Sequence, residues 1–353
     1  MHPILVLKTG ALGDVVRTTA ILPGLHALDP LARVTWVTAP GAVDLVRLHR
    51  LVAEVVALDA KSPASCAEVR ERLRGTRWTR LISLDDEAPL CELASAISTD
   101  RLSGAHAVDG RRVYTPDVAP WFDMGLLSVH GKPVADRMKI ENRRSHPEIL
   151  TSMLGLPMGR PELPIEPANE RFAREFERRH DLRARGAVIG LNTGAGGRWR
   201  SKMLTPERTA EVAFAVDAAL GGRATFVLFG GADERERNRA IVAGFGMRVR
   251  LVDAGVDNSL LDFAALISLC DLMLTSDSLA LHVALARRVR TVAFFAPTSA
   301  AEIEMFGLGE KVASTAPDAC SYAPDADTST LTVERLAAAM LRQLEAVRPA
   351  PTP

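Results

Sequence analysis

The chain opens on a glycine-bearing loop that holds a single carboxylate. The apolar run Ile4–Leu7 leads into TGALGD, which ends at Asp14 and is followed by a helical pattern. Loops of this kind between a strand and a helix usually bind phosphate through backbone N–H groups, so a carboxylate is unexpected there. The loop matches neither GxGxxG nor GxxxxGKS/T. Asp14 is therefore either the N-cap of the next helix, the commonest role of Asp at that place, or a functional carboxylate.

A second loop combines glycines with hydroxyls and one cation. It spans Asn192–Arg208 with the sequence NTGAGGRWRSKMLTPER and follows an apolar, strand-like run. Glycine N–H groups, the hydroxyls of Thr193 and Ser201 and the ammonium of Lys202 together resemble a phosphate-binding cradle. The alternative is a surface loop without a ligand. The TPE that follows has the pattern of a helix start, with Thr205 as its N-cap.

An acidic residue follows a Gly-Gly pair in the segment LFGGADERERN. Gly230 and Gly231 end a strand-like run, and Glu234 lies early in the next helical pattern. A carboxylate at this place can accept both hydroxyls of a ribose, as acidic residues do in dinucleotide sites. It can equally be a solvated side chain that interacts with the helix dipole. The residues alone leave both interpretations open.

The segment LMLTSDSLALHVALA is the most specific of the four. The apolar run Leu272–Leu274 ends in Thr-Ser-Asp-Ser, and a helical pattern starts after Ser278. The free N–H groups and the dipole of a helix N-terminus suit a pyrophosphate. Asp277 is better explained as a cap or an acceptor for sugar hydroxyls than as a base. His282 is a candidate phosphate contact, although a lone histidine is more often an ordinary core or surface residue.

Motifs of metal-dependent or nucleophilic chemistry are missing from the sequence. DAD at Asp325–Asp327 lies in a Pro- and Ser-rich region rather than at a strand end, and LDDE at Leu84–Glu87 has no accompanying histidine. The chain has no GxSxG, no HExxH and no clustered Cys and His. Its four cysteines are far apart, which favours neither structural zinc nor a disulfide framework. The sequence therefore predicts no metal site.

Composition and charge are those of an ordinary globular protein. Of the 353 residues, 47% are hydrophobic and 24% are charged. The 43 Lys and Arg balance the 43 Asp and Glu, so no overall field favours nucleic acid or an anionic membrane. Because no stretch of 18 or more apolar residues and no signal-peptide pattern occurs, we expect neither a transmembrane segment nor a secretory leader. We expect a cytoplasmic protein, with the inner face of the membrane as the alternative location.

Two halves of the chain alternate strand-like runs with helical patterns, which predicts parallel sheets built from βαβ units. Prolines concentrate in GRPELPIEPAN at Gly159–Asn169, a linker signal between the halves. The segment 106–161 breaks the alternation and is expected to be a loop followed by a helix. We expect a first domain over 1–165, a second over 170–332, and an amphipathic helix over 333–347 ahead of a Pro-rich tail.

The periodicity of apolar residues gives the individual elements. The predicted strands are Ile4–Leu7, Arg33–Val37, Glu54–Leu58, Leu81–Ser83 and Arg101–Ser103, then Ala187–Leu191, Ala224–Phe229, Arg248–Leu251, Leu272–Leu274 and Val289–Phe295. The predicted helices are Gly13–Leu28, Ala42–Leu48, Ser65–Arg74, Ala88–Ile97, Pro206–Leu220, Asp233–Gly244, Ser259–Ser268, Leu279–Leu285, Ala300–Met305 and Val333–Val347. Ligands of such sheets bind beyond the C-terminal ends of strands, where the four segments above are placed.

Taken in order, the four segments resemble the heptosyltransferase family, glycosyltransferase family 9. ILVLKTGALGDVVRTTAILPGLHALDPLARVTWVTAP is similar to the family's N-terminal signature. GLNTGAGGRWRSKMLTPERTAEVA, LFGGADERERNRAI and SDSLALHVALARRVRTVAFFAPTS are similar to motifs of its second half. The resemblance is weakest over 106–161. It implies an α/β, GT-B fold, in which two Rossmann-like, doubly wound domains face each other across a cleft. The acceptor binds the first domain, the nucleotide-sugar binds the second, and the last helix commonly crosses back to the first.

The resemblance also implies roles for individual residues. Asp14 falls on the family's proposed catalytic base. The positions that match its nucleotide-sugar site are Thr193, Lys202, Glu234, Asn258, Asp277, Ser278 and His282. Within this set Lys202 matches a phosphate-binding lysine and Glu234 a ribose-binding glutamate, whereas Asn258 falls where backbone atoms meet the base.

Further residues are candidates for the acceptor side. Gly10 and Gly13 would leave room beside Asp14 for an incoming acceptor. Arg143 and Arg144 lie in the locally basic KPVADRMKIENRRSHPE and would hold an anionic or polyhydroxylated acceptor, or else form a solvated helix face. The acceptor stays open between a glycan, the core of lipopolysaccharide and a small molecule such as an aminoglycoside.

The reaction that the resemblance implies is inverting transfer of a heptose or hexose. The donor would be a nucleotide-diphosphate sugar, ADP-heptose-like or UDP-linked, and neither metal nor other cofactor is expected. Leu279 stands where the family usually has Gly, Asn192-Thr193-Gly194 where it often has Asn-Pro-Gly, and Cys320 alone remains of a C-terminal Cys cluster. These departures leave the reaction type unchanged, but they keep both the donor and the acceptor open. The alternatives are a non-catalytic nucleotide-sugar-binding protein and an epimerase or phosphorylase on the same fold.

Overall fold

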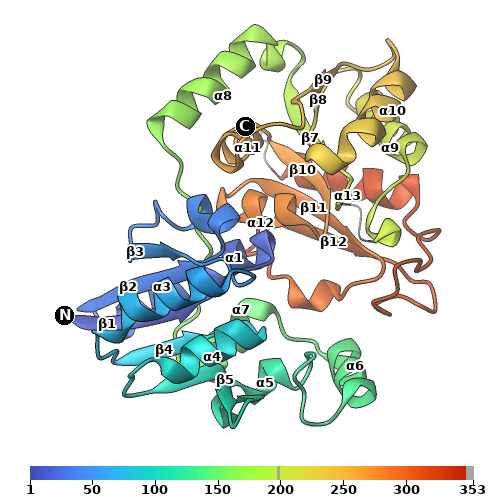
Figure 1. Cartoon of the computed structure of the whole chain (residues 1–353). Helices are drawn as coiled ribbons and strands as arrows, with labels where there is room; N and C mark the ends of the chain where they lie inside the picture. Colours follow the sequence, from blue (N-terminus) through green and yellow to red (C-terminus); the bar gives the residue numbers. More distant parts are fainter. Residues whose placement is uncertain (197–198, 347–353) are drawn as a thin grey trace, which may run out of the picture. The chain divides into compact units, whose positions relative to one another are not determined.

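The chain forms two compact units, described here from a computed structural model that covers residues 1–196 and 199–346 (Figure 1). Unit 1 consists of Met1–Pro164 and Ala301–Glu304, and unit 2 of Ile165–Ala300 and the described part of Met305–Pro353. Each unit contains one six-stranded sheet with helices between its strands. Within the described ranges, no helix is both long enough and apolar enough to cross a membrane.

Unit 1 is built on a mostly parallel sheet. Its strands are β1 (His2–Leu7), β2 (Ala32–Thr38), β3 (Val52–Ala57), β4 (Arg80–Ser83), β5 (Leu102–Val108) and β6 (Arg111–Tyr114). Their order in the sheet is β3-β2-β1-β4-β5-β6, and only β6 runs antiparallel to its neighbour. The order reverses between β1 and β4, which is the place where sheets of this kind bind ligands.

Short helices connect these strands. They are α1 (Leu12–Thr18), α2 (Ile21–Leu28), η1 (Pro40–Leu45), α3 (Pro63–Arg74), α4 (Ala88–Ala96), η2 (Pro116–Val118), α5 (Ala119–Phe122), α6 (Lys132–Glu141) and α7 (His146–Leu154). Helices α3 and α4 pack against each other, and beneath them Leu5, Val69, Leu81 and Leu93 belong to one buried cluster. Helix α3 begins at Ser62, whose hydroxyl caps the N–H of Ser65.

Unit 2 repeats this topology with an all-parallel sheet. Its strands are β7 (Ala187–Asn192), β8 (Ala224–Leu228), β9 (Leu251–Asp253), β10 (Leu272–Ser276), β11 (Arg290–Phe295) and β12 (Gly309–Ala313). They lie in the order β12-β11-β10-β7-β8-β9, so the reversal falls between β7 and β10. Every residue of β8 and β10 is buried, because helices cover both faces of the sheet.

The second half of the chain has ten helical segments in the described residues. They are α8 (Pro167–Arg179), η3 (Leu182–Arg185), η4 (Arg200–Lys202), α9 (Pro206–Ala219), η5 (Ala232–Glu234), α10 (Arg235–Phe245), α11 (Leu260–Ile267), α12 (Leu279–Ala286), η6 (Ala300–Glu302) and α13 (Val333–Glu345). Helix α13 packs on α9, β11 and β12, and its buried Leu336 and Met340 join the core of unit 2. The last residue of the predicted helix, Val347, and the Pro-rich tail lie outside the described residues.

The prediction for 106–161 is wrong in detail. Instead of a loop followed by a helix, β5 continues to Val108 and pairs with β6 in a two-residue hairpin, and α5, α6 and α7 follow. The turn residues Asp109 and Gly110 both have positive φ (49° and 74°), as a type I′ turn requires. Asp-Gly between two short strands is a hairpin signal that the sequence does contain.

Other differences concern element length. The predicted helix Gly13–Leu28 is two helices that break at Thr19 and Ala20, and the 3-10 helix Pro40–Leu45 stands where the helix Ala42–Leu48 was predicted. Helix α8 starts inside the predicted linker, and strand β12 was not predicted. Seven of the thirteen residues of helix α8 are charged and only Ala173 is buried, although Ala168, Phe172 and Phe176 recur at helical spacing. The helical pattern was therefore present in the sequence and was missed beside the prolines of the linker.

Close packing around β7 makes one glycine a stability determinant. A Cβ atom on Gly190 would lie 2.1 Å from Met273 Sδ and 3.0 Å from Cys270 Sγ. We expect Gly190→Ala to lower the free energy of unfolding by about 1–3 kcal/mol, measured by chemical denaturation. The control is Gly244→Ala on α10, where no atom lies within 4 Å of the added carbon. It should leave stability unchanged or raise it. Equal stability of Gly190→Ala and wild type would contradict this packing.

Candidate active site

A cavity of about 300 Å³ lies in unit 2 beyond the C-terminal ends of its strands. It is lined by Asn192, Ala195, Gly196, Gly230, Gly231, Glu234, Val256, Asn258, Leu260, Phe263, Ser278, Leu279 and Ala280. These residues come from the end of β7, from the loops after β7, β8, β9 and β10, and from the first turns of α11 and α12, around the point where the strand order reverses between β7 and β10. Three of the predicted nucleotide-sugar residues, Glu234, Asn258 and Ser278, are therefore brought together.

An ion pair joins the loop after β7 to the loop after β10. Lys202 Nζ lies 3.0 Å from Asp277 Oδ2 and donates to Asp277 O at 3.1 Å. Burial of Asp277 opposes its ionisation, but the positive charges of Lys202 and His282 outweigh that effect and lower the pKa of the carboxyl to about 2. The ammonium also lies 5.4 Å from the centre of the Trp199 ring. Lys202 is thus held beside Ser278, at the start of α12.

Glu234 connects two glycine loops. Its Oε1 accepts from the N–H of Gly196 and its Oε2 from the N–H of Gly231, each at 2.6 Å. Because Gly196 follows β7 and Gly231 follows β8, one carboxylate ties the two loops together across the cavity. A carboxylate that holds two N–H donors in this way can exchange them for the two hydroxyls of a diol.

Ser278 and His282 belong to α12. Ser278 is the N-cap residue of this eight-residue helix, and its Oγ lies 3.4 Å from Asn192 Nδ2 and 3.2 Å from Thr275 Oγ. His282 is buried one turn further along the helix. The first N–H groups of α12 therefore face the same cavity edge as the hydroxyl of Ser278.

Two predicted residues have supporting positions. Thr193 is fully buried and does not line the cavity; its Oγ lies 2.9 Å from Thr209 Oγ. Asn258 Nδ2 donates to Ala254 O at 2.9 Å, which closes the loop after β9. The Thr193 side chain therefore supports the loop, whereas Asn258 lines the cavity.

Arg237 is a partly buried residue beside the site that the sequence reasoning missed. Its Nη2 donates to Thr193 Oγ at 2.7 Å and to Leu204 O at 2.6 Å, so it reaches the loop that carries Lys202. Burial lowers the pKa of its guanidinium to about 10, against the opposing effect of Glu234. The signal was present, since an arginine three residues after Glu234 lies on the same side of a helix.

In unit 1, Asp14 is not the N-cap of α1. The N-cap residue is Ala11, whose side chain makes no capping hydrogen bond, and Asp14 lies in the first turn of the helix. Asp14 Oδ1 is 2.9 Å from Arg17 Nη2, and its side chain is 35% exposed. The Arg17 guanidinium also lies over the Trp121 ring, 5.7 Å from its centre. The N-cap interpretation is therefore wrong, and the carboxylate is both oriented by a cation and accessible to solvent.

A buried aspartate fixes the loop that precedes α1. Asp85 bonds to Lys8 Nζ and the N–H of Thr9, and accepts from Thr9 Oγ at 2.8 Å. Asp85 follows β4 and Lys8 follows β1, so this network spans the strand reversal of unit 1. The LDDE segment, which we interpreted as lacking chemistry, has this positioning role. Gly10, next in the loop, has no atom within 4 Å of a Cβ position.

The two predicted acceptor-side arginines bond locally. Arg143 Nη1 donates to Ile140 O at 2.8 Å, and Arg144 Nη2 donates to Glu148 O at 3.2 Å. Both side chains are exposed, and their contacts help to end α6 and to begin α7. These arginines therefore have a structural role in unit 1, whether or not they also meet a ligand.

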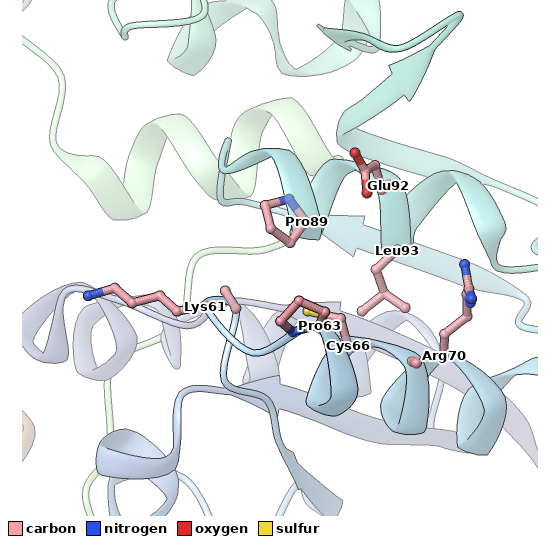
Figure 2. A pocket seen from close by; sticks show the side chains of 9 residues that line it. Lys61, Pro63, Cys66, Arg70, Pro89, Glu92 and Leu93 are labelled. Atoms are coloured by element: carbon pink, nitrogen blue, oxygen red, sulfur yellow. The ribbon is translucent and has the colours of Figure 1, made fainter.

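Unit 1 contains a second cavity, of about 440 Å³, between α3 and α4 (Figure 2). Cys66 and Arg70 line it from α3, and Glu92 and Leu93 from α4. It contains none of the predicted site residues, so we assign the candidate site to the cavity of unit 2. In the parts of the chain that the structure describes, no three His, Cys, Asp or Glu side chains are grouped so that they could hold a metal ion.

Comparison with known proteins identifies the family. The sequence model of glycosyltransferase family 9 (heptosyltransferase) matches residues 130–324, which is more than half of the 353 residues. The chain belongs to glycosyltransferase family 9. The matched range contains every residue of the unit 2 cavity, whereas Asp14 lies outside it. The chain is thus a heptosyltransferase-like glycosyltransferase, and the predicted family is confirmed. No curated protein sequence matches it significantly.

Solved structures confirm the α/β, GT-B fold class of two Rossmann-like domains. A glycosyl transferase family 9 protein from Veillonella parvula is 20% identical, with a TM-score of 0.79 and 98% of both chains covered. The ADP-heptose lipopolysaccharide heptosyltransferase II of E. coli is 17% identical, with a TM-score of 0.67, covering 98% of this chain and 99% of that one. E. coli heptosyltransferase WaaC with ADP-2-deoxy-2-fluoro heptose is 16% identical, with a TM-score of 0.59, covering 98% of this chain and all of that one.

The ion pair between Lys202 and Asp277 predicts a pH-dependent contribution to stability. The pKa of Asp277, about 2, lies below that of an unfolded aspartate, so the contribution is present above about pH 4 and is lost as the pH falls toward 2. We expect Asp277→Asn to be less stable than wild type at pH 7. The difference in unfolding free energy should shrink by about 2 kcal/mol between pH 5 and pH 2. Denaturant titrations across this range check it, and a difference that stays constant would contradict the ion pair.

Proposed function

We propose that the protein is an inverting glycosyltransferase that works without a metal ion or other cofactor. It transfers a heptose or hexose from a nucleoside-diphosphate donor to an acceptor hydroxyl. The observation that carries the proposal is that Glu234 and Ser278 line one cavity at the strand ends of unit 2, while Lys202 is bonded to Asp277, the residue before Ser278. A carboxylate, an ammonium and a helix N-terminus in this arrangement suit the ribose and the diphosphate of a nucleotide.

The donor would lie across the unit 2 cavity. Glu234 would accept the ribose hydroxyls, and Val256, Leu260 and Phe263 offer apolar surface to the nucleobase. The diphosphate would meet Lys202 and the first N–H groups of α12. The complexes of E. coli WaaC with ADP and with ADP-2-deoxy-2-fluoro heptose favour an ADP-heptose-like donor. A UDP-sugar remains the alternative.

Leaving-group departure requires stabilisation of a growing negative charge. As the bond from the anomeric carbon to the diphosphate oxygen breaks, charge accumulates on the phosphates, and fixed cations and dipoles lower that barrier most. Lys202, His282 and the N-terminus of α12 would supply this stabilisation. The ammonium of Lys202 would exchange part of its contact with Asp277 for the phosphate, and Asp277 would become available to sugar hydroxyls.

Nucleophilic attack requires a base, because a neutral hydroxyl is a weak nucleophile. Asp14 is the candidate: it is accessible, and Arg17 orients its carboxylate. It would take the proton of the acceptor hydroxyl as the oxygen bonds to the anomeric carbon from the face opposite the diphosphate, which inverts the configuration.

The acceptor would be held by residues of unit 1. Gly10 and Gly13 would give it room beside Asp14, and Arg143 and Arg144 could contact its anionic or hydroxyl groups in addition to their local bonds. The likeness to a lipopolysaccharide heptosyltransferase favours a lipopolysaccharide-core acceptor, with other glycans and small aminoglycoside-like molecules as alternatives. We place the reaction in the cytoplasm, or at its membrane face if the acceptor is a lipid.

The first test is a thermal-shift and calorimetric comparison of ADP, UDP, GDP and dTDP. A donor nucleotide stabilises the fold by mass action, so one of the four should raise the unfolding temperature above the others. Turnover of the matching nucleotide-sugar should then release nucleoside diphosphate and form a glycoside, with no loss in EDTA. Release of an isomerised nucleotide-sugar instead would favour an epimerase, and absence of binding would contradict the proposed function.

Lys202→Ala should weaken binding of the nucleoside diphosphate. A charge-assisted hydrogen bond is worth about 1.5–3 kcal/mol, so we expect its Kd to rise by about 10- to 100-fold in calorimetry. The matched control is Lys61→Ala, which removes an exposed lysine at the unit 1 cavity and should leave the Kd unchanged. Equal affinity of Lys202→Ala and wild type would remove the lysine from the phosphate site.

Asp14→Asn should bind the donor nucleotide normally and lose turnover. Loss of a general base lowers kcat by about two to four decades, whereas the donor site in unit 2 is left untouched. Steady-state kinetics together with calorimetry separate the two effects. The control Asp44→Asn removes the carboxylate of another Asp–Arg pair of unit 1 with the same spacing and should keep full activity. An unchanged kcat in Asp14→Asn would refute its assignment as the base.

A further inference from the structure

The loop that carries Lys202 has a narrow neck. It leaves the unit 2 core at Thr193 and returns at Leu204, where the N–H of Leu204 donates to Thr193 O at 3.1 Å. Arg237, from α10, contacts both sides of this neck with one nitrogen. Its Nη2 lies 2.6 Å from Leu204 O and 3.1 Å from Thr193 O. A single guanidinium therefore joins the start of the loop to its end.

The contacts of Arg237 with the two ends of the loop, which we call the clasp, lie over buried side chains. Thr193 and Thr209 beneath it are fully buried, and both of their hydroxyls lie within 3.4 Å of Arg237 Nη2. Arg237 Nη1 is buried without a hydrogen-bond partner among the described residues. Burial of the Arg237 guanidinium is unfavourable because not all of its N–H groups are bonded. If packing were its only role, an apolar side chain at this position would do as well. What an apolar side chain would not supply is the charged bond to the two loop ends.

The same end of α10 also holds the middle of the loop. Glu234 is the N-cap residue of α10, one turn before Arg237, and it accepts from the N–H of Gly196. Two side chains from one helix start therefore fix the loop at its neck and at a glycine next to the cavity. Lys202 lies between Gly196 and Leu204, so both contacts restrain the segment that carries it, together with the bonds that Ser201 donates to Pro324 O.

We infer that Arg237 is a positioning residue for donor binding: it clasps the neck of the loop 193–204 and thereby sets the position of Lys202. The inference rests on the proposed function, because it concerns the nucleoside diphosphate that Lys202 is proposed to bind. Arg237 does not touch the donor in this account. Its effect on affinity passes through Lys202, and this makes the two residues energetically coupled.

A double-mutant cycle tests the coupling. The Kd is measured for the nucleoside diphosphate that wild type binds best. Arg237→Met should raise this Kd by about tenfold or more. The Kd of Arg237→Lys should lie between those of wild type and Arg237→Met. Lys202→Ala should raise the Kd much less in the Arg237→Met background than in wild type, because the lysine is already displaced there. If Arg237→Met does not fold, the cycle is made with Arg237→Lys. The KM for the acceptor should not change in any variant.

Arg250→Met is the matched control. Arg250 is another partly buried arginine of unit 2 whose Nη2 donates to backbone oxygens, those of His180 and Asp181, away from the loop. It should lower stability without changing the Kd. An unchanged Kd in the Arg237 variants, fully additive effects with Lys202→Ala, or an equal rise in Arg250→Met would each overturn the inference. Absence of nucleotide binding by wild type would instead overturn the proposed function on which it rests.

Discussion

The site depends on one constraint, the reversal of strand order between β7 and β10. Strands added on one side of β7 and then on the other send their connecting loops in opposite directions, and a gap opens beyond the two strand ends. Unit 2 fills the edge of that gap with the ion pair between Lys202 and Asp277, which links the two diverging loops. The same reversal in unit 1 is spanned by Asp85 and Lys8 and leads to the loop before Asp14.

The polar groups of the site are engaged with one another. Lys202 is neutralised by Asp277, and Glu234 holds the N–H groups of two glycine loops. Unpaired charges in a partly buried place are costly, so these internal bonds stabilise the fold when no ligand is present. The oxygens of a diphosphate would replace Asp277 as the partner of Lys202. The hydroxyls of a ribose would replace the glycine N–H groups as the partners of Glu234. Donor binding would therefore exchange contacts within a shaped site rather than create the site.

Much of this could be predicted from the sequence. Parallel strands buried on both faces give continuous apolar runs, and the loops after them carry Asp14, Lys202, Glu234 and Ser278, so the α/β class and the loop positions follow from pattern. The GT-B fold was predicted from the resemblance to the family. What could not be predicted depends on contacts between distant segments. Thr193 has the residue type and the loop position of a phosphate ligand, but its hydroxyl is hydrogen-bonded to Arg237 and Thr209. Asp85 looked chemically isolated in sequence because its partners follow a different strand.

Hydrogen exchange with and without the preferred nucleoside diphosphate tests the central claim most directly, namely that the loops at the strand reversal of unit 2 bind the diphosphate. The amides of 192–196, 199–204 and 230–235 and the first turn of α12 should exchange more slowly with nucleotide, because they become bonded or shielded. The loop around Asp14 should be unchanged by nucleotide alone. Protection confined to other segments, or no protection under conditions where the nucleotide binds, would contradict this account.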